Sequence, residues 1–504
     1  MRKGPLALAL LVLSVFVLSL VAPSASGGTS SSPNFTVTTL PGSEGGSEPS
    51  LAISTTGARY PSWQAPGEFA RSTDGIHWTN LGEPDDSAVG DVTNSVDASG
   101  AVYNGQICGD AFELHTCIYR STDHAQTWPL KTEPADAHPG ASDRPWIDVY
   151  PHAASGSWNP DTTRVYLEYH TFSPEELAYV TVSTDGGHTF SEPKFITTDT
   201  NALVGSGCNT VPGGVTVDQR NGTVYALWLS GNDVATNLRT GCNYSQLGPF
   251  NKAWVSTSTD GGNTWSAHLA WQGAFDQATA VGDNADKIFA TLSVDRGGQV
   301  QVVLPVRHND DPVSVAANQP EQPSPTDLVL VTSPDQGTHW TAPLNINQKS
   351  GSYFFPWIAA GDAGKFDAVY YRSSSLKPND PSSLWYIGFS QVTNAVATVT
   401  NGQAAYTKLP RVRELLIERT PVHKGGICTF GIFCSATGGN RSLADSIAIA
   451  IDPSGAANAT WTNDYDVATG TSGRNFRRIE FACQSGGPGV FTAASISGCY
   501  KGSL

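Results

Sequence analysis

The chain has 504 residues and a net charge of −16, and only 15% of its residues are charged. Such an acidic chain is not expected to bind nucleic acid or an anionic membrane surface, because both of these partners attract basic proteins. Its 51 glycines, 32 prolines and 13 tryptophans indicate many turns and many large aromatic packing units. The length suits either two or three ordinary domains or one large repeat domain.

The first residues are typical of a secretory signal peptide. Arg2 and Lys3 precede an apolar run over 6–22, which is followed by the small residues of PSASGG. This run is too short for a membrane span, and its flanking residues are those of a cleavage site. We therefore expect residues 1–27 to be a signal peptide and the mature protein to be secreted, with no membrane span.

A Ser/Gly-rich linker is expected over 28–44, and within it NFTVTTL is a candidate for a closing strand. Seven hairpin patterns then follow along the chain, from SLAISTTGARYPSW near the start to IAIAIDPSGAANATWTND near the end. In each, residues typical of β-strands lie on both sides of a turn marked by Gly or Asp, which is the signature of a β-hairpin.

Five hairpins are followed by variants of one phrase, namely RSTDGIHW, RSTDHAQTW, VSTDGGHTF, TSTDGGNTW and TSPDQGTHW. The Asp side chain can accept hydrogen bonds from backbone N–H groups within its own turn. Gly can supply the positive φ that such a turn requires. The closing aromatic residue can be buried against neighbouring strands. We interpret the phrase as a structural fastener between two strands, with no catalytic role.

One repeating unit therefore consists of strand A, a turn, strand B, a loop, strand C, the Asp turn and strand D. Four-stranded units repeated around an axis form a β-propeller. We expect an all-β chain in which residues 45–504 form a single propeller of seven four-stranded antiparallel blades, with six as the alternative. An insertion at about 400–443 is expected to cover the mouth of the central channel or a blade edge. Within it, RVRELLIER could be a short helix or an extra strand.

The repeated phrase resembles the Asp box, or BNR repeat, and the chain resembles the superfamily of Asp-box β-propellers, whose best-known enzymes are the sialidases. The resemblance implies that a ligand binds over the central channel, on the face of the B–C and D–A loops. It also implies a site in which three arginines bind the sugar carboxylate, a tyrosine paired with a glutamate acts as nucleophile, and an aspartate acts as acid/base.

Arg144, Arg307 and Arg372 lie at strand ends on this face and are the candidates for the arginine clamp, because guanidinium groups bind carboxylates in a bidentate manner. Tyr371 is the candidate nucleophile, with Tyr169 as the alternative. Glu168 would be the partner that takes the proton of the phenol. Asp143, or alternatively Asp464, would be the acid. The chain departs from the sialidase pattern because its first strand, EPSLAIS, contains no arginine.

Further candidates for substrate binding lie at the ends of the predicted B strands. They are Tyr169, His170, Trp228, His308, Trp461 and Asp464. For the two tryptophans the alternative is packing in the core, and for the two histidines it is an ordinary polar role in a loop.

The eight cysteines suggest disulfides, as expected in an oxidising compartment. Pairing nearest neighbours gives Cys108 with Cys117, Cys208 with Cys242, Cys428 with Cys434 and Cys483 with Cys499. No cofactor and no transition-metal site is expected. The oxygen-rich segments HNDDP at His308 and DNAD at Asp283 are weak candidates for calcium.

The sequence thus favours a secreted, sialidase-like glycoside hydrolase, acting on terminal glycosidic bonds of an extracellular glycan or glycoprotein and working as a monomer. The alternative is a propeller without catalytic activity that binds a glycan or a protein. Fold alone does not distinguish the two, because one fold hosts many functions.

Overall fold

The computed structural model describes residues 1, 32–64, 68–85, 88–109, 114–136, 141–171, 177–197, 210–231, 250–276, 281–285, 289–309, 325–376, 380–429, 434, 440–469, 476–491 and 495–504. The expected signal peptide, apart from Met1, lies outside this part of the chain. Among the residues that are described, no helix is both long enough and apolar enough to cross a membrane.

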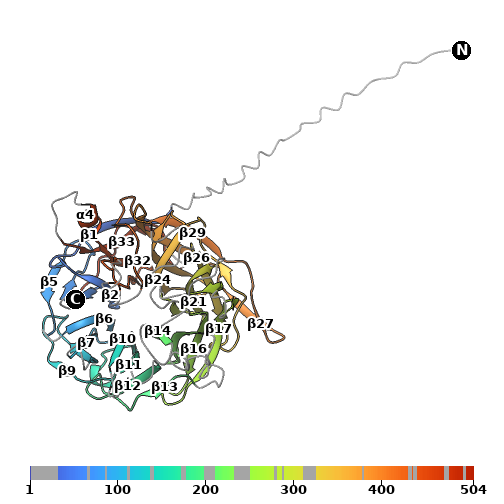
Figure 1. Ribbon diagram of the computed structural model, residues 1–504. Coiled ribbons are helices and arrows are strands. Elements are labelled where there is room, and N and C mark those ends of the chain that lie inside the picture. Colours follow the sequence, from blue (N-terminus) through green and yellow to red (C-terminus); the bar gives the residue numbers. More distant parts are fainter. Residues whose placement is uncertain are drawn as a thin grey trace.

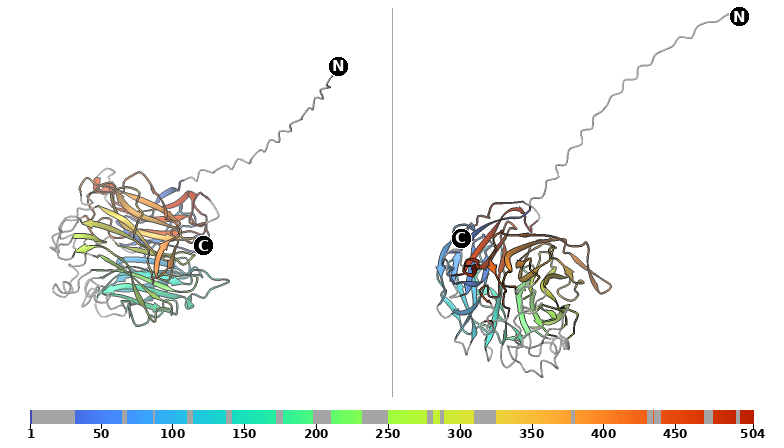
Figure 2. Two further views of the ribbon diagram at one scale, coloured as in Figure 1. Left: turned by 90° about the vertical axis from the view of Figure 1, so that its right-hand side faces the viewer. Right: turned by 45° about the horizontal axis from the view of Figure 1, so that its top comes forward.

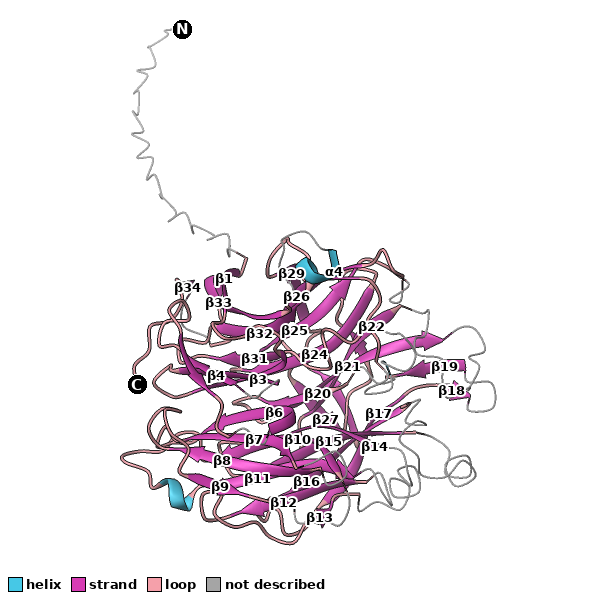
Figure 3. Cartoon of the chain, turned by 60° about the vertical axis from the view of Figure 1, so that its left-hand side comes forward, coloured by secondary structure: helices cyan, strands magenta, loops and turns pink. Residues whose placement is uncertain are grey.

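The structure is a β-propeller of seven antiparallel blades arranged in a ring (Figure 1), which confirms the predicted fold class and blade number. Almost every described element is a strand (Figure 3); the short helices are η1 (Pro160–Thr162) and α4 (Tyr465–Thr469). Each blade has strand A next to the axis and strand D at the rim. Local hairpins therefore build the blades, and packing of one blade on the next builds the core.

The strands of each blade, from the axis outward, have the following bounds. Blade one consists of β2 (Ser47–Ile53), β3 (Arg59–Gln64), β4 (Glu68–Arg71) and β5 (Thr79–Gly82). Blade two consists of β6 (Ala88–Val96), β7 (Val102–Cys108), β8 (His115–Ser121) and β9 (Leu130–Thr132). Blade three consists of β10 (Ser142–Tyr150), β11 (Arg164–Thr171), β12 (Ala178–Ser183) and β13 (Lys194–Phe195). Blade four consists of β14 (Thr210–Val217), β15 (Val224–Ser230), β16 (Lys252–Ser258) and β17 (Ser266–Gln272).

The last three blades carry additional strands. Blade five consists of β20 (Thr291–Val294), β21 (Val300–Asn309), β22 (Thr326–Ser333) and β23 (Leu344–Asn345), with β19 (Val281–Asn284) and β18 (Phe275–Asp276) added at the far end of β21. Blade six consists of β24 (Ser352–Ala360), β25 (Phe366–Ser373), β26 (Leu384–Thr393) and β29 (Arg411–Leu416), with β30 (His423–Lys424) also paired to β26. Blade seven consists of β31 (Ala448–Ile451), β32 (Ala457–Asn463), β33 (Arg478–Pro488) and β1 (Asn34–Thr39), with β34 (Ser495–Ser497) paired to β33.

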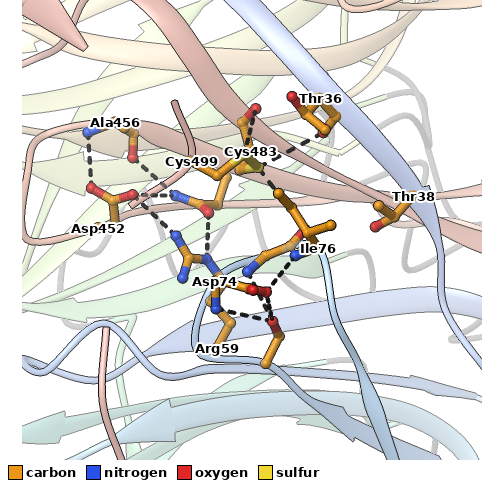
Figure 4. Close-up of a disulfide and its surroundings, with 12 residues drawn as sticks. Thr36, Thr38, Arg59, Asp74, Ile76, Asp452, Ala456, Cys483 and Cys499 are labelled. Atoms are coloured by element: carbon orange, nitrogen blue, oxygen red, sulfur yellow. Dashed lines mark hydrogen bonds and ion pairs between the residues drawn. A yellow bond between two sulfur atoms is a disulfide. The ribbon is translucent and has the colours of Figure 1, made fainter. Parts of the chain in front are cut away.

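Blade seven combines one strand from near the start of the chain with strands from near its end. Strand β1, from the segment considered as a closing strand, pairs antiparallel with β33 and is the outer strand of this blade. At the junction with blade one, the fully buried Arg59 donates to Asn458 at 2.7 Å and pairs with Asp452 at 3.3 Å (Figure 4). A disulfide between Cys483 and Cys499 lies beside this network. Both ends of the chain therefore help to close the ring.

The five repeated Asp turns have the hydrogen bonds that the sequence predicts. In blade three, Asp185 accepts the backbone N–H and the hydroxyl of Thr189 at 2.9 and 2.6 Å. Ser183 donates to Asp185 and accepts the N–H of Gly187, both at 2.8 Å. The equivalent aspartates in the other turns are Asp74, Asp123, Asp260 and Asp335. The polar groups of the turn thus form their hydrogen bonds with one another.

The Asp turns share one face of the ring with the A–B turns. In blade three, Gly186 of the Asp turn donates to the carbonyl of Thr163 in the A–B turn at 3.0 Å. The B–C and D–A connections and the starts of the A strands lie on the opposite face. This arrangement is the one that the order of strands within a blade predicts.

The insertion in blade six differs from the expectation in one respect. Residues 411–416, the start of RVRELLIER, form β29, which pairs with β26 as the outer strand of the blade. A separate hairpin of β27 (Ala397–Thr400) and β28 (Gln403–Tyr406) occupies the C–D connection and protrudes from the rim (Figure 2). The D–A connection therefore begins only after Leu416. The run of apolar residues is too short for its period to distinguish helix from strand.

Three of the four expected disulfides are present. Cys108 is joined to Cys117, Cys428 to Cys434 and Cys483 to Cys499. Cys208 and Cys242 lie outside the described residues.

Candidate functional site

A left-handed residue recurs within four residues of the start of the inner strand, on one side of it or the other. Positive φ angles occur here in six blades, at Glu48, Arg144, Gly214, Phe289, Phe355 and Ala444. The register against strand B shifts at this point in five blades, as at a β-bulge. Because a non-glycine residue rarely adopts such a φ, the repetition indicates a local bend imposed by the propeller. The bends bring different side chains from different blades together at one end of the channel.

Arg144 lies at the centre of this group, and its side chain is only 7% exposed. Its guanidinium hydrogen-bonds the carboxylate of Asp445, and it lies 3.6 Å from Asp91 and 3.9 Å from Asp143. The ring of Phe289 packs beneath it, with the centroid 4.3 Å from the guanidinium carbon. We call Glu48, Asp91, Asp143, Arg144 and Asp445 the acidic mouth.

A second arginine belongs to the same network. Arg441, in the connection between blades six and seven, forms two hydrogen bonds with Asp445 and lies 3.8 Å from Glu48. The D–A connection after blade six therefore reaches the acidic mouth through residues 440–445. Whether it covers the mouth as a flap stays a prediction, because most of 430–439 lies outside the described residues.

The carboxyl groups of the acidic mouth have pKa values shifted in opposite directions. Burial raises the pKa of Glu48 well above its usual range, and the nearby charges of Asp91 and Asp445 raise it further. Burial also raises the pKa of Asp91. Burial acts in the same sense on Asp143, but the nearby imidazole of His170 and the charge of Arg144 outweigh it and lower the pKa. The pKa of Asp445 is likewise lowered, because the charges of Arg441 and Arg144 outweigh the effect of burial.

Asp91 and Asp143 are the two carboxylates of this group that solvent reaches, with side chains 19% and 14% exposed. Glu48 and Asp445 are 3% and 1% exposed and lie behind them. The acidic mouth thus presents one carboxyl group that favours its protonated form beside one that favours its ionised form. This is the arrangement from which acid and base roles are assigned in hydrolytic sites.

The three arginines proposed as a clamp have separate partners. Arg144 is surrounded by carboxylates, as described. Arg307 is buried on β21, with its guanidinium 5.9 Å from the ring of Phe354. Arg372 pairs with Glu414 of the outer strand β29 at 2.9 Å. The guanidinium of Arg372 is therefore already paired with a carboxylate of its own blade, a contact that strand spacing alone does not reveal.

The proposed nucleophile and its partner also lie in different surroundings. Tyr371 is fully buried between blades six and seven, where its hydroxyl donates to the carbonyl of Thr462 at 3.2 Å. Glu168 is fully buried against blade four and accepts the N–H of Gly214 at 3.1 Å. Burial raises the pKa of both groups. The structure thus places Tyr371 in the interior, because alternate residues of a central strand face the neighbouring blade.

The alternative tyrosine and the two tryptophans are packing residues. Tyr169 is buried and donates to the carbonyl of Asp136 at 2.8 Å. Trp228 is buried and stacks on Trp254, with ring centroids 5.5 Å apart. Trp461 is buried and donates to Glu480 at 3.0 Å. These side chains stabilise the blades and do not present a surface to a sugar.

Of the remaining polar candidates, His170 lies beside the acidic mouth, whereas Asp464 and His308 have partners outside it. His170 is buried beside the acidic mouth, 3.9 Å from Asp143, and it contacts the carbonyl of Thr210 at 3.0 Å. It therefore positions a carboxylate of the site. Asp464 is buried and pairs with His423 at 2.7 Å, away from solvent.

His308 bridges two carboxylates on blade five, at 2.6 Å from Asp283 and 3.2 Å from Asp327. Hydrogen bonds with Asp327 and Asp283 raise its pKa to about 9. Two carboxylates near the segments considered for calcium therefore share one histidine partner. Asp310 and Asp311 of the HNDDP segment lie outside the described residues.

The sequence reasoning missed Glu48, Asp91 and Asp445. Glu48 stands in EPSLAIS, the strand noted only for its lack of arginine, and Asp91 precedes the second hairpin pattern. The signal that could have found them is positional, because each lies just before or within the first residues of an inner strand. Comparing the starts of all the inner strands would have put these three carboxylates beside Asp143 and Arg144 as candidates.

The sequence matches no protein-family model and no curated protein. Solved structures similar to the chain include a protein of unknown function from Dyadobacter fermentans, at 14% identity over 89% of this chain and 97% of that one, with a TM-score of 0.44. A Hadza microbial sialidase is similar at 12% identity over 86% and 74%, with a TM-score of 0.39. An ulvan lyase is similar at 12% identity over 92% and 98%, with a TM-score of 0.47. At this level of similarity, the functional argument rests on the residues of this chain.

Proposed function

We propose that the protein is a secreted glycoside hydrolase that cleaves terminal glycosidic bonds of an extracellular glycan at the acidic mouth. One observation carries the proposal: Asp91 and Asp143 are partly exposed, flank one guanidinium, and have pKa values shifted in opposite directions. Most glycoside hydrolases use two carboxyl groups in opposite protonation states.

The roles follow from the direction of each shift. Asp91, whose protonated form is favoured, donates a proton to the glycosidic oxygen as the bond to the anomeric carbon breaks. Asp143, whose ionised form is favoured, takes a proton from the attacking water or attacks the anomeric carbon itself. His170 and Arg144 stabilise the charge on Asp143. Arg144 is a positioning residue that holds both carboxylates.

The charge of the acidic mouth favours a neutral sugar. Four carboxyl groups surround Arg144, and its strongest contact is already with Asp445. A substrate carboxylate would have to displace one of these groups, whereas a neutral sugar needs only hydrogen bonds. Sialosides are the alternative substrate class, and they would require the arginine clamp of Arg144, Arg307 and Arg372 to exchange its present partners.

The test is a comparison of 4-methylumbelliferyl glycosides of neutral hexoses and pentoses with the corresponding sialoside. We expect turnover of a neutral glycoside, and a loss of about 10²- to 10⁴-fold in kcat/KM in both Asp91→Asn and Asp143→Asn. The matched control is Asp161→Asn on the opposite face, whose carboxylate is 54% exposed.

Two outcomes would contradict the proposal. Wild-type turnover that both variants retain would place the chemistry elsewhere. An absence of turnover on every glycoside, together with saturable binding to a glycan array, would support the alternative of a non-catalytic binding propeller.

A further inference from the structure

The central channel contains a cavity that the proposed function does not use. Its volume is 470 Å³, and its walls are formed by the inner strands of all seven blades. It extends from below the acidic mouth to the face of the A–B turns, where the partly exposed His152, Arg220 and Arg296 surround its opening. A volume of this size is within the range of small-molecule pockets.

Aromatic side chains lie at one end of this cavity. Trp146 of blade three and Trp357 of blade six meet across the axis, with ring centroids 4.7 Å apart. Each stands two residues beyond a left-handed residue of the mouth, namely Arg144 and Phe355. Both rings line the cavity, at its end nearer the acidic mouth. We call it the turn-side pocket.

The end of the pocket offers a hydrogen-bond donor that the protein does not use. The indole N–H of Trp146 is buried and has no hydrogen-bond partner in the described part of the chain. A buried donor without a partner is costly, and the cost is removed when water or a ligand oxygen accepts from it. Because the ring shields this N–H from the cavity, an oxygen-bearing occupant can accept from it only after a local movement of the Trp146 ring.

The walls are rich in hydroxyl groups and backbone edges. Ser50, Thr93 and Ser293 each accept an N–H from the inner strand of the next blade, at 3.0, 3.3 and 3.0 Å. These contacts leave each hydroxyl proton free to donate, since no acceptor for it is found among the described residues. The inner edge of each A strand also faces the channel without a partner strand. A ligand with several hydroxyl groups can use both kinds of group.

The charged groups at the opening are already neutralised. Arg220 forms two hydrogen bonds with Asp218, at 2.9 and 2.6 Å. Arg296 pairs with Asp362 at 3.4 Å, and His152 contacts Asp148 at 2.6 Å. The carboxylate of Asp295, which also lines the cavity, accepts hydrogen bonds from Gly297, Gln299, Gln301 and Gly364. Among the described residues the charges at the opening are therefore paired or hydrogen-bonded, which favours a neutral ligand.

We propose that the turn-side pocket binds a neutral polyhydroxylated molecule, such as a mono- or disaccharide, with its ring against Trp146 and Trp357. Aromatic side chains bury the apolar face of the sugar ring, while the indole N–H and the wall hydroxyls bind its oxygens. The pocket lies on the opposite face from the acidic mouth. Its occupancy does not depend on whether the chain is a hydrolase.

The experiment is titration of the full chain with glucose, galactose, N-acetylglucosamine and cellobiose. Binding is followed by tryptophan fluorescence and by saturation-transfer NMR of the sugar protons. We expect saturable binding of at least one sugar, weakened roughly two- to tenfold in Trp146→Phe, which keeps a ring but removes the N–H donor. Ser293→Ala is the second variant, because it removes a wall hydroxyl with little change in volume. Asp161→Asn, on the same face but outside the walls of the pocket, should leave the affinity unchanged.

Each outcome decides the proposal. Weaker binding in Trp146→Phe or Ser293→Ala, with normal binding in Asp161→Asn, supports it. If no sugar binds, the cavity holds only water and the proposal is wrong. If Asp91→Asn abolishes binding while the pocket variants retain it, the sugar binds at the acidic mouth, and the result supports only the proposed function.

Discussion

Two groups of carboxylates in this propeller differ in how their charge is stabilised. The five aspartates of the repeated turns accept hydrogen bonds from their own turns, and the bonds from Thr264 lower the pKa of Asp260 to about 2. In the acidic mouth, burial raises the pKa of Glu48 and Asp91 instead. The first group is satisfied by local backbone, and the second by side chains from distant blades.

The difference explains why the conspicuous motif and the site that we propose are separate features. A turn that supplies its own hydrogen bonds can be repeated in each blade without regard to its neighbours. The acidic mouth forms once, because its residues come from blades one, two and three and from the connection into blade seven, and no two of these contribute the same set of side chains. A ligand that displaces one of these distant partners also changes the pKa of the carboxyl group beside it. The carboxylate of a self-contained turn keeps its hydrogen bonds when such a ligand binds.

Removing the central cation is expected to have the largest effect on stability. Arg144→Met leaves Asp91, Asp143 and Asp445 without their shared guanidinium, and loss of one member of a buried ionic group costs about 3–5 kcal/mol. Urea unfolding should show this decrease. The matched control is Arg296→Met, which breaks the exposed pair with Asp362 and should cost less than about 1 kcal/mol. Equal effects in the two variants would contradict the central role of Arg144.

Breaking one repeated turn should have an intermediate effect on stability and none on the site. Asp185→Ala removes the acceptor for the N–H and hydroxyl of Thr189, and we expect a loss of about 1–2 kcal/mol in the free energy of unfolding. Activity or ligand binding at the acidic mouth should stay unchanged at a temperature where the variant is folded. A loss of binding without a loss of stability would show that the turn has a functional role.

The smallest expected effect is a difference in pH dependence. The folded pKa of Glu48 is raised, so its favourable contribution is complete below its unfolded value of about 4.3 and is lost as pH rises through the folded value. Glu48→Gln should therefore gain stability relative to the wild type between pH 4 and pH 8.

The turn aspartates should behave in the opposite way. The folded pKa of Asp185 is lowered, so its contribution is present above about pH 4 and is lost as the pH falls. The deficit of Asp185→Ala should therefore shrink on acidification. Thermal unfolding of both variants and the wild type from pH 3 to 8 measures the two trends. Trends of the same sign would contradict the distinction between the two groups.

Local patterns predicted the blades well, because hairpins and Asp turns depend on residues close in sequence. The same patterns could not predict that Arg144 meets Asp445, 301 residues away, or that Arg372 pairs with Glu414 across its own blade. They also could not tell that Tyr371 faces the neighbouring blade, since both faces of a buried strand are apolar. Asp143 and Arg144 were found because they stand together at the start of an inner strand.

The most direct measurement of the central claim pairs one carboxylate from each group. Asp91→Asn and Asp185→Asn would be compared with the wild type in glycoside turnover and in urea unfolding. Turnover should fall about 10²- to 10⁴-fold in Asp91→Asn with little loss of stability, while Asp185→Asn should lose stability and keep its turnover. Turnover that is kept in Asp91→Asn but lost in folded Asp185→Asn would contradict the account.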